Sequence, residues 1–278
     1  MRLTQDTING FSTKLVRSGR SANTAKAYTS DLKVFMLWAD ERGSEVNAES
    51  FNDLAQDWLT ETRKDAAPKT TRRRLTSLKG VAKFAGFPND LDEYIAPTPA
   101  RAVAHPISGG TDVLLAMLRA ARKPEHRALV ALQGFGGLRV SEALAVRPAD
   151  VDARNGLITV WGKGSKVRHV PFEVGGEAFA AILAQMENVS DPSDTIVGLP
   201  DRTARYTITA LAKKVGIEER VASHDLRMTA GTGVFERSGY NIRVAQEFLG
   251  HASIQQTQVY TEVTMDSIRK AVSLNGGE

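Results

Sequence analysis

A proline-rich segment without helical periodicity divides this chain of 278 residues into two parts. The segment is APTPARAVAHP, residues 96–106, and it contains three prolines. Proline fixes φ and removes a backbone donor, so such a segment is typical of an extended linker, here able to span roughly 30 Å. The sequence therefore predicts two domains, residues 1–95 and 107–278, joined by this linker.

The N-terminal part is predicted to be entirely helical. In residues 23–42 the apolar side chains recur at the i, i+4, i+7 and i+8 positions of an amphipathic helix, which Gly43 ends. Two further helices are predicted over residues 50–62 and 68–84. The second begins with Pro68, a residue that suits the first turn of a helix.

The C-terminal part is predicted to be mostly helical with one small antiparallel sheet. Helices are expected over residues 111–122, with Ser108 as a possible N-cap, over residues 125–135, and from about Ser141. Residues 156–172 instead alternate β-branched and polar side chains around a Gly-Lys-Gly-Ser turn, which is typical of a β-hairpin. From Gly175 onward the helical pattern returns, with the segments 204–217, 223–239, 242–250 and 254–263. The predicted fold class is therefore mainly α.

Composition excludes several classes of protein. Hydrophobic residues make up 42% and charged residues 24% of the chain, as in ordinary globular proteins. The chain has no cysteine, which excludes disulfides, thiol catalysis and cysteine-ligated zinc. It has neither an apolar run of membrane-spanning length nor a secretory signal, so we expect a soluble, intracellular protein without a membrane partner.

Basic residues gather in one helix of the N-terminal part. The net charge is only +4, but between Arg63 and Lys83 eight basic residues stand against one acid, Asp65. Such a local excess favours a polyanionic partner. The alternative is a solvated helix face without a partner.

Two arginines stand where helices are predicted to begin. Arg139 follows a Gly-Gly-Leu junction, and Glu142 is available to orient it. His224 and Arg227 lie three residues apart, on one face of a helix that begins near Ser223. The terminal amides and the helix dipole add to the arginine's charge there, so this face suits an anion. The alternative is that each motif is purely structural.

Three other residues are candidates for chemistry. Lys163 has glycine on both sides at the predicted hairpin tip, although a solvated turn lysine is the alternative. His251 precedes Tyr260 by nine positions, and alternatively it caps a helix while the tyrosine ring packs. Metal binding by His224 and His251 lacks a nearby carboxylate and a ligand spacing, so no metal is expected.

Taken in order, these residues resemble the tyrosine recombinases of the phage integrase family. The segments GLRVSEAL, GKGSKVRHVP, HDLRMTAGT and FLGHASIQQTQVYTEV carry the resemblance, over nearly all of residues 130–265. NTAKAYTSDLKVFMLWA and KTTRRRLTSLKGVAKFAG resemble the family's core-binding domain. Met228 stands where many relatives have histidine, and no arm-binding domain is recognised, which implies a simple integrase.

The resemblance implies the catalytic residues Arg139, Lys163, His224, Arg227, His251 and Tyr260, with Glu142 supporting Arg139. Tyr260 would attack the scissile phosphorus and hold it covalently, while the two arginines neutralise the charge on the phosphate oxygens. Lys163, which matches the lysine of the family's GKG motif, would protonate the departing 5′ oxygen. His224 would accept the tyrosine proton or hold a phosphate oxygen, and His251 would donate to the phosphate.

DNA contacts are expected from Thr70, Thr71, Arg72 and Arg74 in the first domain and from Lys166 and Arg168 on the hairpin. Lys166 and Arg168 are also alternatives to Lys163 as the general acid. Residues 264–274 are expected to pack either on a neighbouring protomer or on their own domain.

The function that the resemblance implies is site-specific recombination of double-stranded DNA core sites, with integration and excision of a phage or mobile element. The active form would be a homo-tetramer on two duplexes, and the free protein would be a monomer or a dimer. An accessory directionality factor would be a further partner. Alternatives are a Xer-like role in chromosome dimer resolution, a topoisomerase-like activity, and DNA binding without catalysis. No metal, ATP or other cofactor is expected, because arginines replace a cation and the phosphotyrosine bond retains its energy. The expected location is the cytoplasm of a bacterial host.

Overall fold

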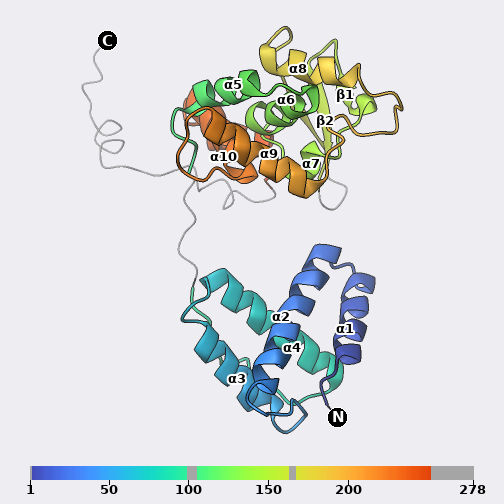
Figure 1. The fold of residues 1–278 in the computed structure, drawn as a ribbon, viewed down its shortest axis with the longest axis vertical. Coiled ribbons are helices and arrows are strands. Elements are labelled where there is room, and N and C mark those ends of the chain that lie inside the picture. The colour runs from blue at the N-terminus through green and yellow to red at the C-terminus, as the bar shows by residue number, and fades with distance from the viewer. Residues whose placement is uncertain (1, 99–104, 163–166, 252–278) are drawn as a thin grey trace, which may run out of the picture. The chain divides into compact units, whose positions relative to one another are not determined.

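The computed structural model describes residues 2–98, 105–162 and 167–251 (Figure 1). The chain forms two compact units, residues 1–101 and 102–278, and the division between them falls inside the proline-rich segment.

The N-terminal unit is built from α-helices that pack against one another. They are α1 (Gln5–Arg17), α2 (Ala22–Asp40), α3 (Phe51–Thr62) and α4 (Pro68–Ala85). Helix α2 begins after Ser21, whose side chain accepts from the backbone N–H of Thr24, and α4 ends at Gly86 in the left-handed conformation. The helices predicted over residues 23–42, 50–62 and 68–84 are therefore present.

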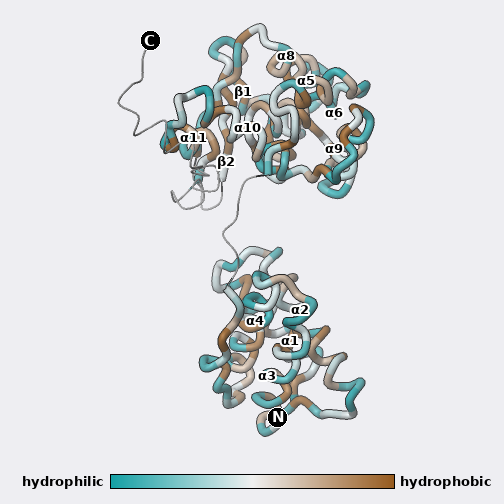
Figure 2. The backbone as a smooth tube through the Cα atoms, turned by 90° about the vertical axis from the view of Figure 1, so that its left-hand side faces the viewer, coloured by the Kyte–Doolittle hydropathy of each residue, from teal (hydrophilic) through white to brown (hydrophobic). Residues whose placement is uncertain are grey.

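Aromatic rings fill the core of the N-terminal unit. Phe35 lies between Phe51 and Trp58, with ring centroids 5.9 and 5.3 Å apart, and all three side chains are fully buried. Helix α4 adds an apolar stripe that includes Leu75 and Leu78. Figure 2 shows brown and teal stretches alternating along the helices of this unit, as expected for amphipathic helices.

The C-terminal unit combines helices with a small sheet. Its elements are α5 (Gly110–Ala120), α6 (Pro124–Val130), the π-helical turn η1 (Ala131–Phe135), α7 (Val140–Ala143), the 3₁₀ turn η2 (Pro148–Asp150), β1 (Val151–Asp152), β2 (Leu157–Trp161), β3 (Val167–Pro171), α8 (Glu177–Met186), α9 (Asp201–Lys214), α10 (Ser223–Arg237) and α11 (Ile242–Leu249). The sheet is antiparallel in the order β1-β2-β3. Its inner face contributes Ile158, Val160 and Val170 to the core, which α5, α6, α8, α9 and α10 complete.

The C-terminal unit differs from the sequence-based expectations in three places. The residue before α5 is Gly109 rather than Ser108, and no side chain caps this helix. The helix predicted over residues 125–135 ends as the π-helical turn η1. Strand β1 was not predicted, because two residues are too short to show an alternating pattern. Within the described residues, no helix has the length and apolar character needed to cross a bilayer.

Candidate active site

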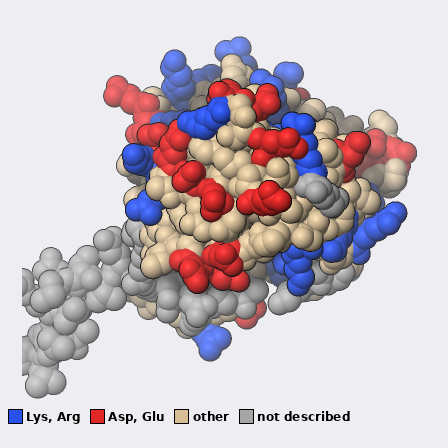
Figure 3. All heavy atoms as spheres, turned by 90° about the horizontal axis from the view of Figure 1, so that it is seen from below, with Lys and Arg blue, Asp and Glu red and all other residues tan. Residues whose placement is uncertain are grey.

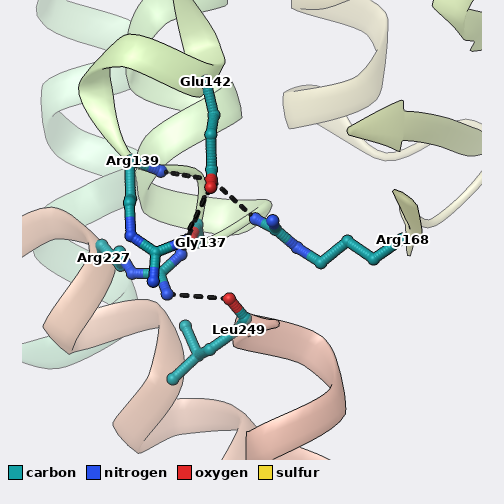
Figure 4. Close-up of polar contacts among 6 residues, drawn as sticks. All are labelled: Gly137, Arg139, Glu142, Arg168, Arg227 and Leu249. Atoms are coloured by element: carbon teal, nitrogen blue, oxygen red, sulfur yellow. Dashed lines mark hydrogen bonds and ion pairs between the residues drawn. The ribbon is translucent and has the colours of Figure 1, made fainter. Parts of the chain in front are cut away.

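A buried carboxylate, that of Glu142, is the centre of the site. It stands in the first turn of α7, with 6% of its side chain exposed. One oxygen accepts from Arg139 Nη1 at 2.7 Å, and the other accepts from the Arg139 backbone N–H at 2.9 Å and from Arg168 Nη2 at 2.8 Å. Figure 4 shows the guanidinium groups of Arg139, Arg168 and Arg227 gathered around it from separate elements.

The turn before α7 places Arg139 beside this carboxylate. The chain leaves η1 through Gly136 and Gly137, and Gly137 has φ +61°, a conformation that favours glycine. A Cβ atom there would also lie 2.7 Å from a ring atom of Phe248 in α11, so only glycine lets this helix approach so closely. Arg139 then takes the N-cap position of α7, with an extended backbone and 41% of its side chain exposed.

Arg227 in α10 holds two other segments of the site in place. Its side chain is 1% exposed, and it donates to the carbonyl oxygen of Gly137 and, at 2.8 Å, to that of Leu249. Leu249 is the last residue of α11, where carbonyls lack an intrahelical partner, so the guanidinium satisfies a helix end. Its Nη1 also lies 3.9 Å from a carboxylate oxygen of Glu142.

His251 follows directly after this helix end. Gly250 ends α11 in the left-handed conformation with φ 64°, and the His251 backbone N–H then donates to the Gln246 carbonyl at 3.1 Å. The Gln246 side chain donates back to the His251 carbonyl at 3.3 Å. Helix capping therefore fixes the backbone of His251 at the site.

The side chain of Arg168 packs against Gly250, which leads to a first prediction. Gly250→Ala would place a Cβ atom 2.7 Å from Arg168 Cδ in a conformation that already strains alanine. We expect a loss in the free energy of unfolding of about 2 kcal/mol or more, measured by chemical denaturation. Gly175→Ala is the matched control, because Gly175 also has positive φ but no atom within 4 Å of its Cβ position. Equal losses in the two variants would contradict the contact.

Burial, and after it the positive charges of the arginine cluster (Arg139, Arg168 and Arg227), favours the neutral form of the site histidines. Burial is the largest cause that lowers the pKa of His251 to about 4, and the charges of Arg227 and Arg139 lower it further. The pKa of His224, the second residue of α10, is also lowered, first by partial desolvation of its ring and then by the charge of Arg227, against an opposing effect of Asp225. Neutral imidazole can accept a proton or donate one from its ring N–H.

Glu142 gives a second prediction, on pH dependence. Burial alone would raise its pKa, but hydrogen bonds from Arg168 and from the Arg139 backbone outweigh this and lower the pKa from 4.5 to about 2. Because the folded state has the lower pKa, the ionised carboxylate stabilises the fold above pH 4.5, and this contribution is lost as the pH falls from 4.5 to about 2. The difference corresponds to about 3 kcal/mol.

The measurement is the free energy of unfolding of the wild type and of Glu142→Gln across that pH range. The Gln variant is expected to be less stable near neutral pH and to lose less stability on acidification. Glu236→Gln, at an exposed position of α10, is the control that keeps the wild-type pH dependence. A parallel pH dependence in wild type and Glu142→Gln would contradict the ion-pair geometry.

Several predicted residues lie outside the described part of the chain. They are Lys163, Lys166, Tyr260 and residues 264–274. The strands on either side of the hairpin tip are described, and they pair with Trp161 opposite Val167.

Arg168 belongs to the arginine cluster. Only 13% of its side chain is exposed, and its guanidinium donates to Glu142. It shares the inward face of β3 with the buried Val170, while Val167 and His169 face outward. The alternation along this strand was the signal that could have placed Arg168 in the site.

The residues of α4 that were expected to contact DNA differ in their exposure to solvent. The prediction for Thr71 is wrong, because its side chain is fully buried: it lies on the same face as Leu75 and Leu78. Thr70 is half-buried and Arg72 is exposed. The guanidinium of Arg74 lies over the ring of Trp58, 5.0 Å from its centroid, and is half-buried.

The neighbouring Arg73 is bound to Asp31 by two hydrogen bonds of 2.8 Å, so part of the basic charge of α4 is already paired. The surface charge is mixed elsewhere too. In Figure 3, acidic and basic side chains are both interspersed among other residues. Among the residues that the structure describes, no three His, Cys, Asp or Glu side chains gather in a way that could hold a metal ion.

Comparison with known proteins identifies the family of the chain. The sequence model of the phage integrase family matches residues 111–267, and that of the phage integrase N-terminal SAM-like domain matches residues 8–86. Tyrosine recombinase XerC of Xanthomonas campestris pv. campestris is 33% identical, over 90% of this chain and 81% of that protein. Tyrosine recombinase XerA of Thermococcus kodakarensis is 30% identical, over 96% of this chain and 94% of that protein.

Solved structures show a similar fold. The XerH site-specific recombinase bound to its difH substrate has a TM-score of 0.72 at 16% identity, covering 98% of this chain and 85% of that one. A lambda integrase dimer bound to a COC′ core site has a TM-score of 0.71 at 18% identity, covering 94% and 95%. Because the family model matches more than half of the chain, and relatives of at least 30% identity align along most of it, the chain belongs to the phage integrase family and is a tyrosine site-specific recombinase.

Proposed function

We propose that this recombinase cleaves and rejoins duplex DNA at core sites through a covalent 3′-phosphotyrosyl intermediate on Tyr260. The observation that carries the proposal is the convergence of Arg139, Arg168 and Arg227 on one buried carboxylate. Three guanidinium groups against one acid leave a net positive site. Such a site suits a phosphodiester whose negative charge increases in the transition state.

Arg139 and Arg227 would act on this charge in different ways. Arg139 keeps 41% of its side chain exposed while Glu142 fixes its orientation, so it can bind a non-bridging phosphate oxygen directly. Arg227 is buried and bound to the Gly137 and Leu249 carbonyls, so it adds positive charge at a fixed position beside Arg139 and His251. A preorganised charge of this kind needs no rearrangement during the reaction.

The remaining residues would transfer protons. Tyr260 Oη attacks phosphorus as its proton passes to neutral His224, and the bond from phosphorus to the 5′ oxygen breaks. Lys163 donates the proton that the departing 5′ oxygen needs, and His251 donates a hydrogen bond to the phosphate. In the second step the 5′ hydroxyl of another strand attacks the phosphotyrosine, and Tyr260 leaves with a proton. The arginines replace a metal ion, and the phosphotyrosine bond replaces ATP.

The partners in this proposal are double-stranded DNA core sites. The XerH and lambda integrase structures with a similar fold were solved on DNA, which supports this choice. On the chain itself, exposed Arg72 and half-buried Thr70 and Arg74 of α4 are the proposed contacts, together with Lys166 on the hairpin. Strand exchange requires two duplexes, so we propose a homo-tetramer, with a directionality factor where integration and excision are controlled separately.

Two biological roles fit this chemistry. Integration and excision of a phage or mobile element is our first proposal. A Xer-like role in chromosome dimer resolution is favoured by the names of the relatives, XerC and XerA. Deletion of the gene separates the two roles: unresolved chromosome dimers after deletion support the second, and loss of element integration without a chromosome defect supports the first.

The test is formation of a covalent adduct. The purified chain is incubated, with chelator and without nucleotide, with a library of nicked duplexes that carry a randomised central segment. An adduct that survives denaturant, and whose DNA is bound through its 3′ phosphate to the peptide containing Tyr260, is the expected result. DNA binding without an adduct would indicate a non-catalytic relative, and relaxation of a plasmid without two sites would indicate a topoisomerase-like enzyme.

A further inference from the structure

A buried hydrogen bond joins two segments of the site that are distant in sequence. Ser223 Oγ donates to Gln133 Oε1 at 2.7 Å, across a sequence separation of 90 residues. The two side chains are 3% and 0% exposed. Polar side chains buried this completely lie in a region of low dielectric, where a hydrogen bond is strong and its loss is costly.

Each partner stands next to the chemical groups of the site. Gln133 lies in the middle of η1, the π-helical turn that leads through Gly136 and Gly137 to Arg139. Ser223 is the first residue of α10, so it directly precedes His224 and lies about one turn before Arg227. The hydrogen bond therefore ties the segment that carries Arg139 to the end of α10 that carries the other two groups.

The cap of α10 leaves the Ser223 hydroxyl available for this bond. A serine at the N-cap position usually accepts from a backbone N–H of the first turn. In α10 the N-cap is Ala222, whose N–H donates to a carboxylate oxygen of Asp225 at 2.7 Å, and Ser223 is the first helical residue, so its hydroxyl makes no cap. The Ser223 hydroxyl is instead turned inward, toward η1.

Stability alone gives no reason for a glutamine at this position. The other amide atom of Gln133, Nε2, is buried and has no hydrogen-bond partner among the residues that the structure describes. An unpaired buried donor destabilises the fold, and an apolar side chain of similar size would avoid that cost. π-helical turns are also frequent at functional sites.

We propose that Gln133 and Ser223 are a pair of positioning residues, which set the distance between Arg139 and the His224–Arg227 end of α10. The proposal rests on the proposed roles of those three residues in strand cleavage. The pair touches no DNA itself. Its loss therefore changes the rate of cleavage and not the affinity for the core site.

The experiment uses a core-site duplex recovered from the wild-type adducts, so failure of the proposed function appears first, as absence of any wild-type adduct. Single-turnover cleavage rates, DNA affinity and the unfolding midpoint are then measured for Gln133→Leu, Ser223→Ala and the double variant. Each single variant is expected to cleave about tenfold to a hundredfold more slowly at unchanged affinity, the cost of a small misplacement of reacting groups. The double variant is expected to be no slower than the slower single variant.

Stability separates positioning from a merely structural role. Removing both partners leaves fewer unpaired polar groups than removing one, so the double variant is expected to recover stability while its rate stays low. Gln185→Leu is the matched control, because Gln185 in α8 is a part-buried amide that also donates outside its own helix, to the Ile196 carbonyl at 2.9 Å. Recovery of the wild-type rate in the double variant, an affinity loss that parallels the rate loss, or an equal rate loss in Gln185→Leu would each overturn the proposal.

Discussion

Replacing Arg227 by alanine is expected to slow formation of the covalent DNA adduct by about 10³-fold or more and to destabilise the C-terminal unit by about 3 kcal/mol or more. The two effects have separate causes. The rate falls because a fixed positive charge is removed from beside the phosphate. Stability falls because the carbonyls of Gly137 and Leu249 lose their donor in a buried site, and the Glu142 carboxylate loses a neighbouring cation.

Arg227→Lys distinguishes charge from geometry. An ammonium keeps the charge, but it cannot reach two carbonyls with the planar fork of a guanidinium. We therefore expect part of the stability to return while the cleavage rate stays well below that of the wild type. The measurements are denaturant unfolding and single-turnover adduct formation on the same core-site duplex.

The matched control for Arg227 lies on the same helix. Arg237→Ala removes an exposed arginine at the end of α10, and it is expected to change stability by no more than about 0.5 kcal/mol. A folded Arg227→Ala protein that cleaves DNA within about tenfold of the wild-type rate would contradict the role proposed for this residue.

Local sequence patterns predicted most of the fold, because each pattern reflects a backbone preference that needs no distant partner. The apolar period identified α2 and α4, and the alternation over residues 156–172 identified β2 and β3. No local pattern of this kind predicted the π-helical turn η1. Its backbone Gly136 N–H donates to the Ala131 carbonyl, five residues back, and no apolar repeat separates this bond from an ordinary helical one.

The resemblance implied that Arg139 and Arg227 act on one phosphate, but it did not imply that Arg168 shares the Glu142 carboxylate with Arg139. Arg139 and Glu142 are three residues apart, so their ion pair could be expected from helix geometry alone. Arg168 joins the same carboxylate from β3, and this contact depends on how the sheet packs against α7. The prediction that Thr71 contacts DNA was wrong because it relied on the local charge of its neighbours Arg72, Arg73 and Arg74. The helical repeat places the Thr71 side chain on the buried face of α4.

The unmatched buried polar atoms mark the limit of sequence interpretation most clearly. Gln133 follows Leu132 in an apolar stretch, and nothing in that stretch indicates that it meets Ser223. Long-range hydrogen bonds of this kind leave no period in the sequence. They are found only when the packing of η1 against α10 is known.

Replacing Tyr260 by phenylalanine is expected to remove the covalent adduct altogether, a loss of about 10⁴-fold or more, while binding to the core-site duplex is retained. The substitution deletes one hydroxyl and keeps the ring, so it tests the nucleophile and not the packing. The readout is the denaturant-resistant adduct on a nicked duplex, measured beside DNA affinity. The comparison distinguishes an enzyme from a DNA-binding module, because only an enzyme has a covalent adduct that the substitution can remove.

The chain supplies matched controls for this variant among its five tyrosines. Tyr206 is 74% exposed in α9, and Tyr240 is 70% exposed between α10 and α11, so both phenols are accessible to DNA. Tyr206→Phe and Tyr240→Phe are expected to form adduct at the wild-type rate, because neither phenol has a bound guanidinium beside it among the described contacts. An adduct that persists in Tyr260→Phe and disappears in Tyr240→Phe would move the nucleophile to the loop before α11, and would leave the arginine cluster without its proposed partner.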